Sequence, residues 1–294
     1  MPPASSMKVL ITGAGGQVGR MLLETRPANV EAVGCTHADL DIGAGDAVSD
    51  CVIRHRPAVI INAAAYTAVD KAESEPAAAQ RINAEGPGHL AAAAAACGAH
   101  LIHISTDFVF DGAASTPYRP DSATHPLSVY GRTKRDGELA VLDALPDRSA
   151  IVRTAWVYAA VGANFVRTML RVMRSNGSAR VVADQVGTPT AARSLAEVLW
   201  RIAGDGEIRG IHHWTDAGVA SWYDFAVAIA EEGAQLGLLP VEVAVMPIAT
   251  ADYPTPARRP SYSVLDKGSL AGFGLTPVHW RKRLRAMLKE IASA

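Results

Sequence analysis

The chain has 294 residues, of which 49% are apolar and 19% are charged, and its formal net charge is −1. This length suffices for one large α/β domain or two linked ones, and the composition is that of a folded globular protein. The near-zero net charge and the lack of a dominant basic cluster argue against a nucleic-acid-binding protein, and no run of about 20 apolar residues is present to span a membrane.

Cysteine usage and the N-terminal segment indicate the compartment. Cys35, Cys51 and Cys97 are widely spaced and odd in number, which argues against a disulfide framework and against a zinc site. Residues 1–6 lack the basic and apolar segments of a signal peptide and are expected to form a short tail. We therefore expect a cytoplasmic protein that binds neither nucleic acid nor membranes.

A glycine-rich loop follows the first predicted strand. Residues 8–12 are apolar and β-branched, as is typical of a buried parallel strand, and a helical pattern begins near Met21. The loop between them, Gly13-Ala14-Gly15-Gly16-Gln17-Val18-Gly19, has the strand–loop–helix context that a dinucleotide-binding fingerprint requires. Its glycines allow a tight turn, close approach of a pyrophosphate and close packing of the helix, whose N-terminus favours anions. We predict that the cofactor is bound by Gly13, Gly16, Gln17 and Val18.

The second strand, predicted over residues 30–34, bears on the choice of cofactor. In NAD-binding proteins a carboxylate at the end of this strand bonds the ribose 2′-hydroxyl. Here Thr36 and His37 come first, and no acid occurs before Asp39. We therefore predict NADPH, with Thr36 and His37 at its 2′-phosphate. NADH stays possible, because a suitable loop geometry would let Asp39 reach back. The next two residues, Asp41 and Ile42, are predicted to pass over the adenine.

Two further buried strands are predicted over residues 57–62 and 100–105. The small residues Ala63, Ala64 and Ala65 follow the first, where they let the backbone approach a ligand at the carboxyl edge of a parallel sheet. Thr106 follows the second and reaches the same edge. The alternation of strands with helical segments predicts an α/β fold with a Rossmann-type doubly wound parallel sheet.

Tyr130 and Lys134 stand four residues apart in the stretch Tyr130-Gly131-Arg132-Thr133-Lys134. In a helix they lie on one face, where a fixed ammonium lowers the pKa of a phenol from about 10 towards the working range. Such a pair is more often two solvated side chains, but its setting here favours a general acid. Together with Thr106, the pair can provide and relay the proton that a hydride reduction needs.

These stretches together resemble the extended short-chain dehydrogenases/reductases and, among them, the dTDP-4-dehydrorhamnose reductase family. The resemblance spans nearly the whole chain and rests on the glycine loop, on the Tyr130 stretch and on residues 62–73, 105–112, 153–158 and 255–260. It implies reduction of the C4 ketone of dTDP-4-dehydro-L-rhamnose to dTDP-L-rhamnose by NADPH or NADH. It further implies that Tyr130 protonates the developing alkoxide, that Thr106 bonds the same oxygen, and that Lys134 holds the nicotinamide ribose and lowers the Tyr130 pKa.

The second half of the chain is expected to recognise the nucleotide-sugar substrate. We predict a cofactor-binding domain over residues 7–158 and mainly a substrate-binding lobe over residues 159–294, interleaved with it. Within the lobe, a helix is predicted to begin near residues 163–165, and Ser221 is predicted to cap another. The adjacent Arg258 and Arg259 suit a pyrophosphate because the guanidinium fork forms paired hydrogen bonds with it. The predicted substrate-binding residues are Thr106, Trp156, Asn164, Arg258 and Arg259.

No metal ion is expected. The strand histidines are interpreted as structural, since no ligand set accompanies His100 and His103, and neighbours on a strand such as His212 and His213 point to opposite faces. Some members of the family bind magnesium at a dimer contact through an acid just after the glycine loop and another that corresponds to Arg193. Here only Glu290 remains of that set, and one acid makes a poor magnesium site. We therefore expect a monomer or a weak homodimer.

Two alternatives stay open. Relatives of this fold act as non-catalytic regulatory subunits, and others are epimerases or reductases of other nucleotide sugars. An epimerase oxidises and re-reduces its substrate with bound NAD and therefore consumes no cofactor. The intact set of Thr106, Tyr130 and Lys134 favours a reductase.

Overall fold

The computed structural model describes residues 6–293, so residues 1–5 of the predicted N-terminal tail lie outside the described part. Its centre is a parallel sheet of six strands in the order β2-β1-β3-β4-β5-β10. These strands are β1 (Met7–Thr12), β2 (Val30–Cys35), β3 (Val59–Asn62), β4 (His100–Thr106), β5 (Ser149–Thr154) and β10 (Gly210–His213). The predicted doubly wound α/β fold is thus confirmed. The winding direction reverses between β1 and β3, which is where such sheets bind ligands at their carboxyl edge.

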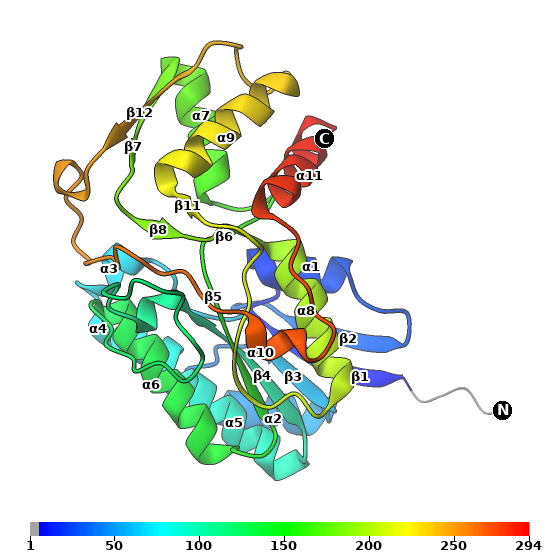
Figure 1. Cartoon of the computed structure of the whole chain (residues 1–294). Helices are drawn as coiled ribbons and strands as arrows, with labels where there is room; N and C mark the ends of the chain where they lie inside the picture. Colours follow the sequence, from blue (N-terminus) through cyan, green and yellow to red (C-terminus); the bar gives the residue numbers. More distant parts are fainter. Residues whose placement is uncertain (1–5, 294) are drawn as a thin grey trace.

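Helices cover both faces of the sheet (Figure 1). On one face α1 (Gln17–Glu24) and α8 (Ala192–Asp205) pack against each other, and on the other lie α2 (Gly45–His55), α5 (Gly86–Cys97) and α6 (Val129–Ala144). The alternation of side chains along a strand explains this, because Val9 faces α1 and α8 whereas its neighbour Leu10 packs on the side of α5 and α6. Both faces are apolar, which is why the strands appear as continuous apolar runs in the sequence.

Four short elements carry the chain along the carboxyl edge of the sheet. They are α3 (Val69–Ala72), α4 (Pro76–Gln80), the π-helical turn η1 (Arg81–Glu85) and the 3₁₀ turn η2 (Asp107–Val109). The turn η2 begins directly after β4, so the residues that follow Thr106 stay at this edge. No helix within residues 6–293 combines the length and the apolar character needed to cross a membrane.

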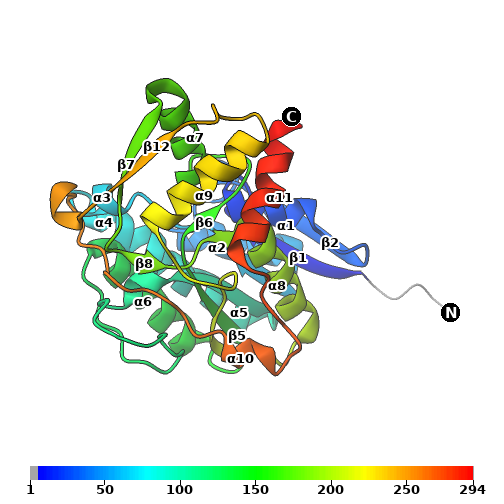
Figure 2. The same ribbon diagram turned by 45° about the horizontal axis from the view of Figure 1, so that its top comes forward.

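A smaller lobe lies beyond the carboxyl edge and is seen from two angles in Figures 1 and 2. Its elements are β6 (Val157–Tyr158), α7 (Phe165–Asn176), β7 (Ser178–Val182), β8 (Val186–Gly187), β9 (Thr190–Ala191), β11 (Ala220–Ser221), α9 (Trp222–Gln235), β12 (Ala244–Ile248), η3 (Thr250–Asp252) and α11 (Trp280–Ala292). The pair β7–β12 is parallel, and a second apolar core, including Phe225 and Leu284, joins α7, α9 and α11. Ser221 caps α9 in a capping box with Asp224, as predicted. Between these elements the chain returns to the sheet domain in α8, β10 and α10 (Gly268–Ala271).

Candidate active site

A cleft of about 1090 Å³ opens at the carboxyl edge of the sheet and is lined by residues from both the sheet domain and the smaller lobe. Its volume slightly exceeds the usual range of small-molecule sites, about 300–1,000 Å³. Fourteen of the predicted site residues line it: Gly13, Gly16, Gln17, Val18, His37, Ile42, Ala63, Ala64, Ala65, Thr106, Tyr130, Lys134, Trp156 and Arg259. The predicted catalytic residues and most of the predicted cofactor residues therefore meet in one cleft.

The glycine loop forms the phosphate end of the cleft. Gly13 has a φ of +68°, and a Cβ atom there would lie 2.6 Å from the Ala63 backbone, so only glycine fits this position. At Gly19 a Cβ atom would lie 2.3 Å from the Gly13 carbonyl oxygen, which shows how closely α1 packs on the loop. No side chain caps α1 at Gly16, which lines the cleft. The first-turn N–H groups are thus available to an anion, and the loop fits the pyrophosphate of a dinucleotide.

The end of β2 differs from the sequence-based expectation. The Asp39 carboxylate accepts hydrogen bonds from the Thr36 backbone N (2.9 Å) and hydroxyl (2.7 Å), and these bonds lower the pKa of Asp39. An acid does reach back to this strand end, and the Thr36 hydroxyl is engaged by it and does not line the cleft. His37 lines the cleft together with Arg20, whose Nε donates to the Gly15 carbonyl oxygen at 2.9 Å. Arg20, which directly follows the glycine loop, was not predicted as a site residue.

Asp41 also lies outside the cleft lining. Its carboxylate accepts from Arg81 Nη1 at 2.7 Å and from the Gly43 backbone N at 2.9 Å. Arg81 lowers the pKa of Asp41, and Arg81 itself lines the cleft. Asp41 therefore holds Arg81, a cleft residue that was not predicted from the sequence.

Two predicted substrate residues, Asn164 and Arg258, are not among the residues that line the cleft. Asn164 caps α7 through its Oδ1, and its Nδ2 donates to Gln17 Oε1 at 3.0 Å and to the Ala159 carbonyl oxygen at 2.8 Å. The side-chain amide of Asn164 is therefore already hydrogen-bonded within the protein, and it connects α7 with the glycine loop. Arg258 is exposed, whereas the neighbouring Arg259 is half-buried in the cleft wall.

Thr106 and Tyr130 come to the cleft from the end of β4 and from the start of α6. Thr106 is the last residue of β4, and its hydroxyl donates to Asp107 Oδ1 (3.1 Å) and accepts from the Phe108 N (3.2 Å). Tyr130 lies in the first turn of α6, which Ser128 caps by accepting a hydrogen bond from the Gly131 N. The Phe108 ring meets the Tyr130 ring edge to face, with centroids 5.4 Å apart. This contact fixes the phenol over the strand end.

The pKa of Tyr130 moves against the expectation. Burial raises it to about 12, contact with the Thr106 hydroxyl lowers it, and the Asp107 charge raises it. The phenol is therefore protonated at neutral pH. The Lys134 Nζ donates to the Ile104 carbonyl oxygen at 2.6 Å. Burial lowers the pKa of Lys134 itself to about 8, while Glu138 raises it.

Asp107 is a further polar group at this site. Its side chain is buried, lines the cleft and has no hydrogen-bond partner for Oδ2 within the described residues. Burial raises its pKa to about 6, and hydrogen bonds from Ser263 and Thr106 lower it. An acid that follows the predicted Thr106 directly was a signal available in the sequence.

Aromatic side chains form the wall towards the smaller lobe. The Trp156 and Trp222 rings stack with centroids 3.5 Å apart and an interplanar angle of 6°, and both line the cleft. Trp156 has a positive φ of 49°, an uncommon conformation that turns the chain at the end of β5. Tyr66, directly after the predicted Ala63–Ala65, also lines the cleft, and its hydroxyl donates to Glu75 at 2.7 Å.

The acids near α1 are paired with an arginine. Arg193 contacts the Glu24 carboxylate, and its Nε lies 3.6 Å from Glu290 Oε1. In residues 6–293 there is no group of three or more histidine, cysteine or acidic side chains placed to hold a metal ion. His212 and His213 bond separate partners, the Arg209 and Tyr118 carbonyl oxygens.

Comparisons with known proteins agree with this geometry. The family model described as the RmlD substrate binding domain matches residues 7–293. A dTDP-4-dehydrorhamnose reductase of Streptomyces griseus is 46% identical over 97% of this chain and 94% of the relative. A probable dTDP-4,6-dihydroxy-2-methyloxan-3-one 4-ketoreductase of Streptomyces antibioticus is 44% identical over 98% and 97%. Among solved structures, the dTDP-4-dehydrorhamnose reductase of Bacillus anthracis in complex with NADP has a TM-score of 0.91 at 34% identity, covering 97% of this chain and 99% of that one.

Proposed function

We infer the reaction from the fact that this chain belongs to the RmlD substrate binding domain family and, within it, to the dTDP-4-dehydrorhamnose reductases. We propose that it reduces the C4 ketone of dTDP-4-dehydro-L-rhamnose to dTDP-L-rhamnose with NADPH. One observation carries this proposal: Thr106, Tyr130 and Lys134 line the same cleft as the glycine loop. A hydride donor and a proton donor can therefore act on one carbonyl group.

Tyr130 is the general acid of the proposed reaction. A nicotinamide held in the cleft would supply the hydride to the carbonyl carbon. Tyr130 gives its phenolic proton to the carbonyl oxygen as negative charge develops there, and Thr106 donates a hydrogen bond to the same oxygen. The raised pKa of Tyr130, about 12, keeps the proton on the phenol until the alkoxide forms. Lys134 binds the nicotinamide ribose through its amine.

The basic residues at the end of β2 support the choice of NADPH. Arg20 and His37 line the cleft there and offer hydrogen bonds to a 2′-phosphate, although the Asp39 carboxylate lies close by. The relative from Bacillus anthracis was solved with NADP, which agrees with this choice. NADH is the weaker but permitted donor, because Asp39 stands where an acid bonds a 2′-hydroxyl.

The smaller lobe is proposed to hold the nucleotide sugar. The stacked pair Trp156 and Trp222 presents an apolar wall to a sugar ring. Arg259 lines the cleft, and the guanidinium N–H groups that do not bond Asp70 can bond the pyrophosphate. A second candidate substrate is another dTDP-4-keto sugar. The relative from Streptomyces antibioticus favours it, because a 4-ketoreductase of a different sugar shares 44% identity with this chain.

A single assay tests the proposal. The purified protein is mixed with NADPH and with dTDP-4-dehydro-L-rhamnose generated in situ, and the absorbance of NADPH is followed while the product is identified. We expect one NADPH oxidised for each dTDP-L-rhamnose formed, at a rate at least equal to that with NADH. Product without cofactor consumption would indicate an epimerase, and cofactor binding without turnover would indicate a regulatory subunit. Faster turnover of a different dTDP-4-keto sugar would favour the second candidate.

A further inference from the structure

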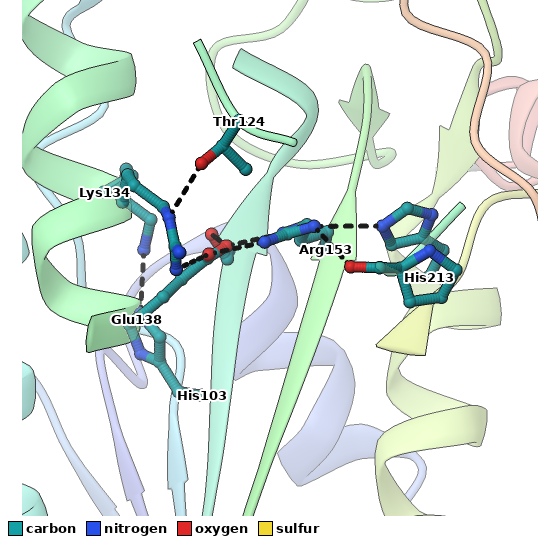
Figure 3. Close-up of polar contacts among 9 residues, drawn as sticks. His103, Thr124, Lys134, Glu138, Arg153 and His213 are labelled. Atoms are coloured by element: carbon teal, nitrogen blue, oxygen red, sulfur yellow. Dashed lines mark hydrogen bonds and ion pairs between the residues drawn. The ribbon is translucent and has the colours of Figure 1, made fainter. Parts of the chain in front are cut away.

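A row of buried polar side chains leads from β1 to the catalytic lysine. Thr12 Oγ1 donates to Asn62 Oδ1 at 2.7 Å, and Asn62 Nδ2 lies 3.0 Å from His103 Nδ1. His103 Nε2 in turn lies 3.4 Å from Lys134 Nζ, the contact drawn in Figure 3. All four side chains are at most 2% exposed. His103, which was interpreted from the sequence as a structural strand residue, thus contacts Lys134 directly.

The direction of these hydrogen bonds fixes where the His103 ring carries its proton. The Ala64 backbone N–H donates to Asn62 Oδ1 at 3.1 Å, so the amide oxygen must face β1 and the NH₂ group must face His103. The Nδ1 atom of His103 therefore accepts a hydrogen bond. Burial and the Lys134 charge hold the pKa of His103 well below its usual range, so the ring is neutral and its single proton is on Nε2.

This N–H group faces the Lys134 amine. A hydrogen bond from Nε2–H needs a lone pair on Nζ, which a neutral amine has and an ammonium lacks. The other contact of Lys134, its donation to the Ile104 carbonyl oxygen at 2.6 Å, is open to both forms. The His103 contact therefore stabilises only the neutral amine.

We propose that His103 is a positioning residue that, oriented by Asn62, stabilises the neutral amine of Lys134 and so sets the pH at which this lysine loses its proton. The negative charge of a nearby carboxylate opposes this stabilisation of the neutral amine. Glu138, one turn further along α6 and fully buried, favours the ammonium. The role in catalysis rests on the reaction proposed above, in which Lys134 binds the nicotinamide ribose.

The Glu138 charge is itself largely balanced, as Figure 3 shows. Arg153 Nε and Nη2 both bond its carboxylate at 2.8 Å, the Ser105 hydroxyl donates at 2.6 Å, and Arg135 Nη1 lies at 3.1 Å. Two further titratable groups line the cleft together with Lys134, namely Tyr130 on α6 and Asp107 on η2. With its neighbouring carboxylate neutralised, Lys134 is left sensitive to the His103 hydrogen bond.

Two substitutions at His103 separate hydrogen bonding from packing. In His103→Asn the amide oxygen replaces Nδ1 as acceptor for Asn62, and no donor is left for Lys134. In His103→Gln the amide N–H takes the place of Nε2–H and keeps the donor. The matched control is His100→Asn, the same change at the start of the same strand, away from the cleft lining.

The expected results follow from the direction in which loss of the His103 hydrogen bond shifts the Lys134 pKa. If the ammonium form of Lys134 is active, kcat/KM falls as the pH rises through its pKa. His103→Asn raises that pKa and moves the alkaline limb up by about one pH unit, the equivalent of one hydrogen bond. His103→Gln and His100→Asn keep the limb where it is. A limb unmoved in His103→Asn, or moved equally in His103→Gln, overturns the proposal.

Nuclear magnetic resonance tests the same inference without substrate. In the cofactor-free protein, the ¹³Cε shift of Lys134 reports its pKa in each variant, and the ring ¹⁵N shifts of His103 report which nitrogen carries the proton. We expect the proton on Nε2 in the unsubstituted protein and a raised Lys134 pKa only in His103→Asn. A proton on Nδ1 refutes the inference even if no variant folds. A protein that shows these shifts but does not reduce the proposed sugar retains this inference and loses the proposed substrate.

Discussion

Arg259 and Asp70 form a two-pronged ion pair at the edge of the cleft, with Nη1 3.0 Å from Oδ1 and Nη2 2.7 Å from Oδ2. The Ala257 backbone N also donates to Asp70, at 3.2 Å. The pair lowers the pKa of Asp70 and ties the loop after η3 to α3. It holds the guanidinium plane at the cleft wall, so binding of the proposed pyrophosphate there would cost little further side-chain freedom.

Substitution of the two adjacent arginines tests this assignment. Arg259→Ala removes charge-assisted hydrogen bonds to the pyrophosphate, so we expect kcat/KM for the nucleotide sugar to fall by roughly 10- to 100-fold, mostly through KM. Arg258→Ala is the matched control, because Arg258 is exposed and outside the cleft lining, and it should stay within about twofold. Steady-state kinetics of both variants decide, and equal losses in both would contradict the assignment.

Substitution of the phenol tests acid catalysis. Tyr130→Phe keeps the ring and its contact with Phe108 but removes the proton donor, so kcat should fall by ~10² or more. The affinity for NADPH, measured by titration of its fluorescence, should barely change. Lys134→Ala should weaken both rate and cofactor binding, because Lys134 serves both. A Tyr130→Phe enzyme with ordinary turnover would remove Tyr130 from this role.

A buried carboxyl outside the cleft predicts a pH effect on stability. Asp216 is 0% exposed, accepts a hydrogen bond from the Ala191 N, and has a pKa that burial raises to about 6. Because this value lies above that of the unfolded chain, the carboxyl's stabilising contribution is present below about pH 4 and is lost as the pH rises to about 6.

Asp216→Asn removes that dependence. Relative to the unsubstituted protein, the variant should gain free energy of unfolding between pH 4 and pH 7, by about 3 kcal/mol if the full shift is expressed. Urea unfolding at both pH values measures the gain. A difference between the two proteins that is the same at pH 4 and pH 7 would show that this carboxyl does not titrate as described.

Chelation is predicted to leave the enzyme active. The Arg193 guanidinium already pairs with Glu24 and lies 3.6 Å from Glu290. In the proposed reaction Thr106 and Tyr130 polarise the carbonyl, so no Lewis acid is needed there. Turnover should be unchanged after EDTA, and the elution volume on a sizing column, that of a monomer or weak dimer, should not respond to magnesium. Loss of turnover on chelation, or a dimer that magnesium reassembles, would contradict this prediction.

The parts of the site that the sequence predicted are those that depend on local order along the chain. A strand, a glycine loop and a helix in succession give Gly13 and Gly16 their places whatever the rest of the chain does. Tyr130 and Lys134 follow in the same way from helical spacing. Residues directly after the strand ends, such as Tyr66 and Asp107, were within reach of the same reasoning.

The remaining features depend on side-chain choices that spacing does not determine. Trp222 reaches Trp156 only through the packing of α9 within the smaller lobe. Asn164 is of a residue type that often contacts substrates. It directly precedes α7, however, and its side chain caps that helix. Lys134 lies one turn from Tyr130, but its amine turns towards Ile104 and His103, so the expected lowering of the Tyr130 pKa does not occur.

Isotope transfer tests the central claim most directly. NADPH that carries deuterium at the transferring position of its nicotinamide ring is supplied with dTDP-4-dehydro-L-rhamnose, and the product is analysed by nuclear magnetic resonance. Direct hydride transfer in this cleft predicts one deuterium at C4 of the rhamnose for each NADPH oxidised. An unlabelled product, or deuterium at any other carbon, would contradict reduction of the C4 ketone by this chain.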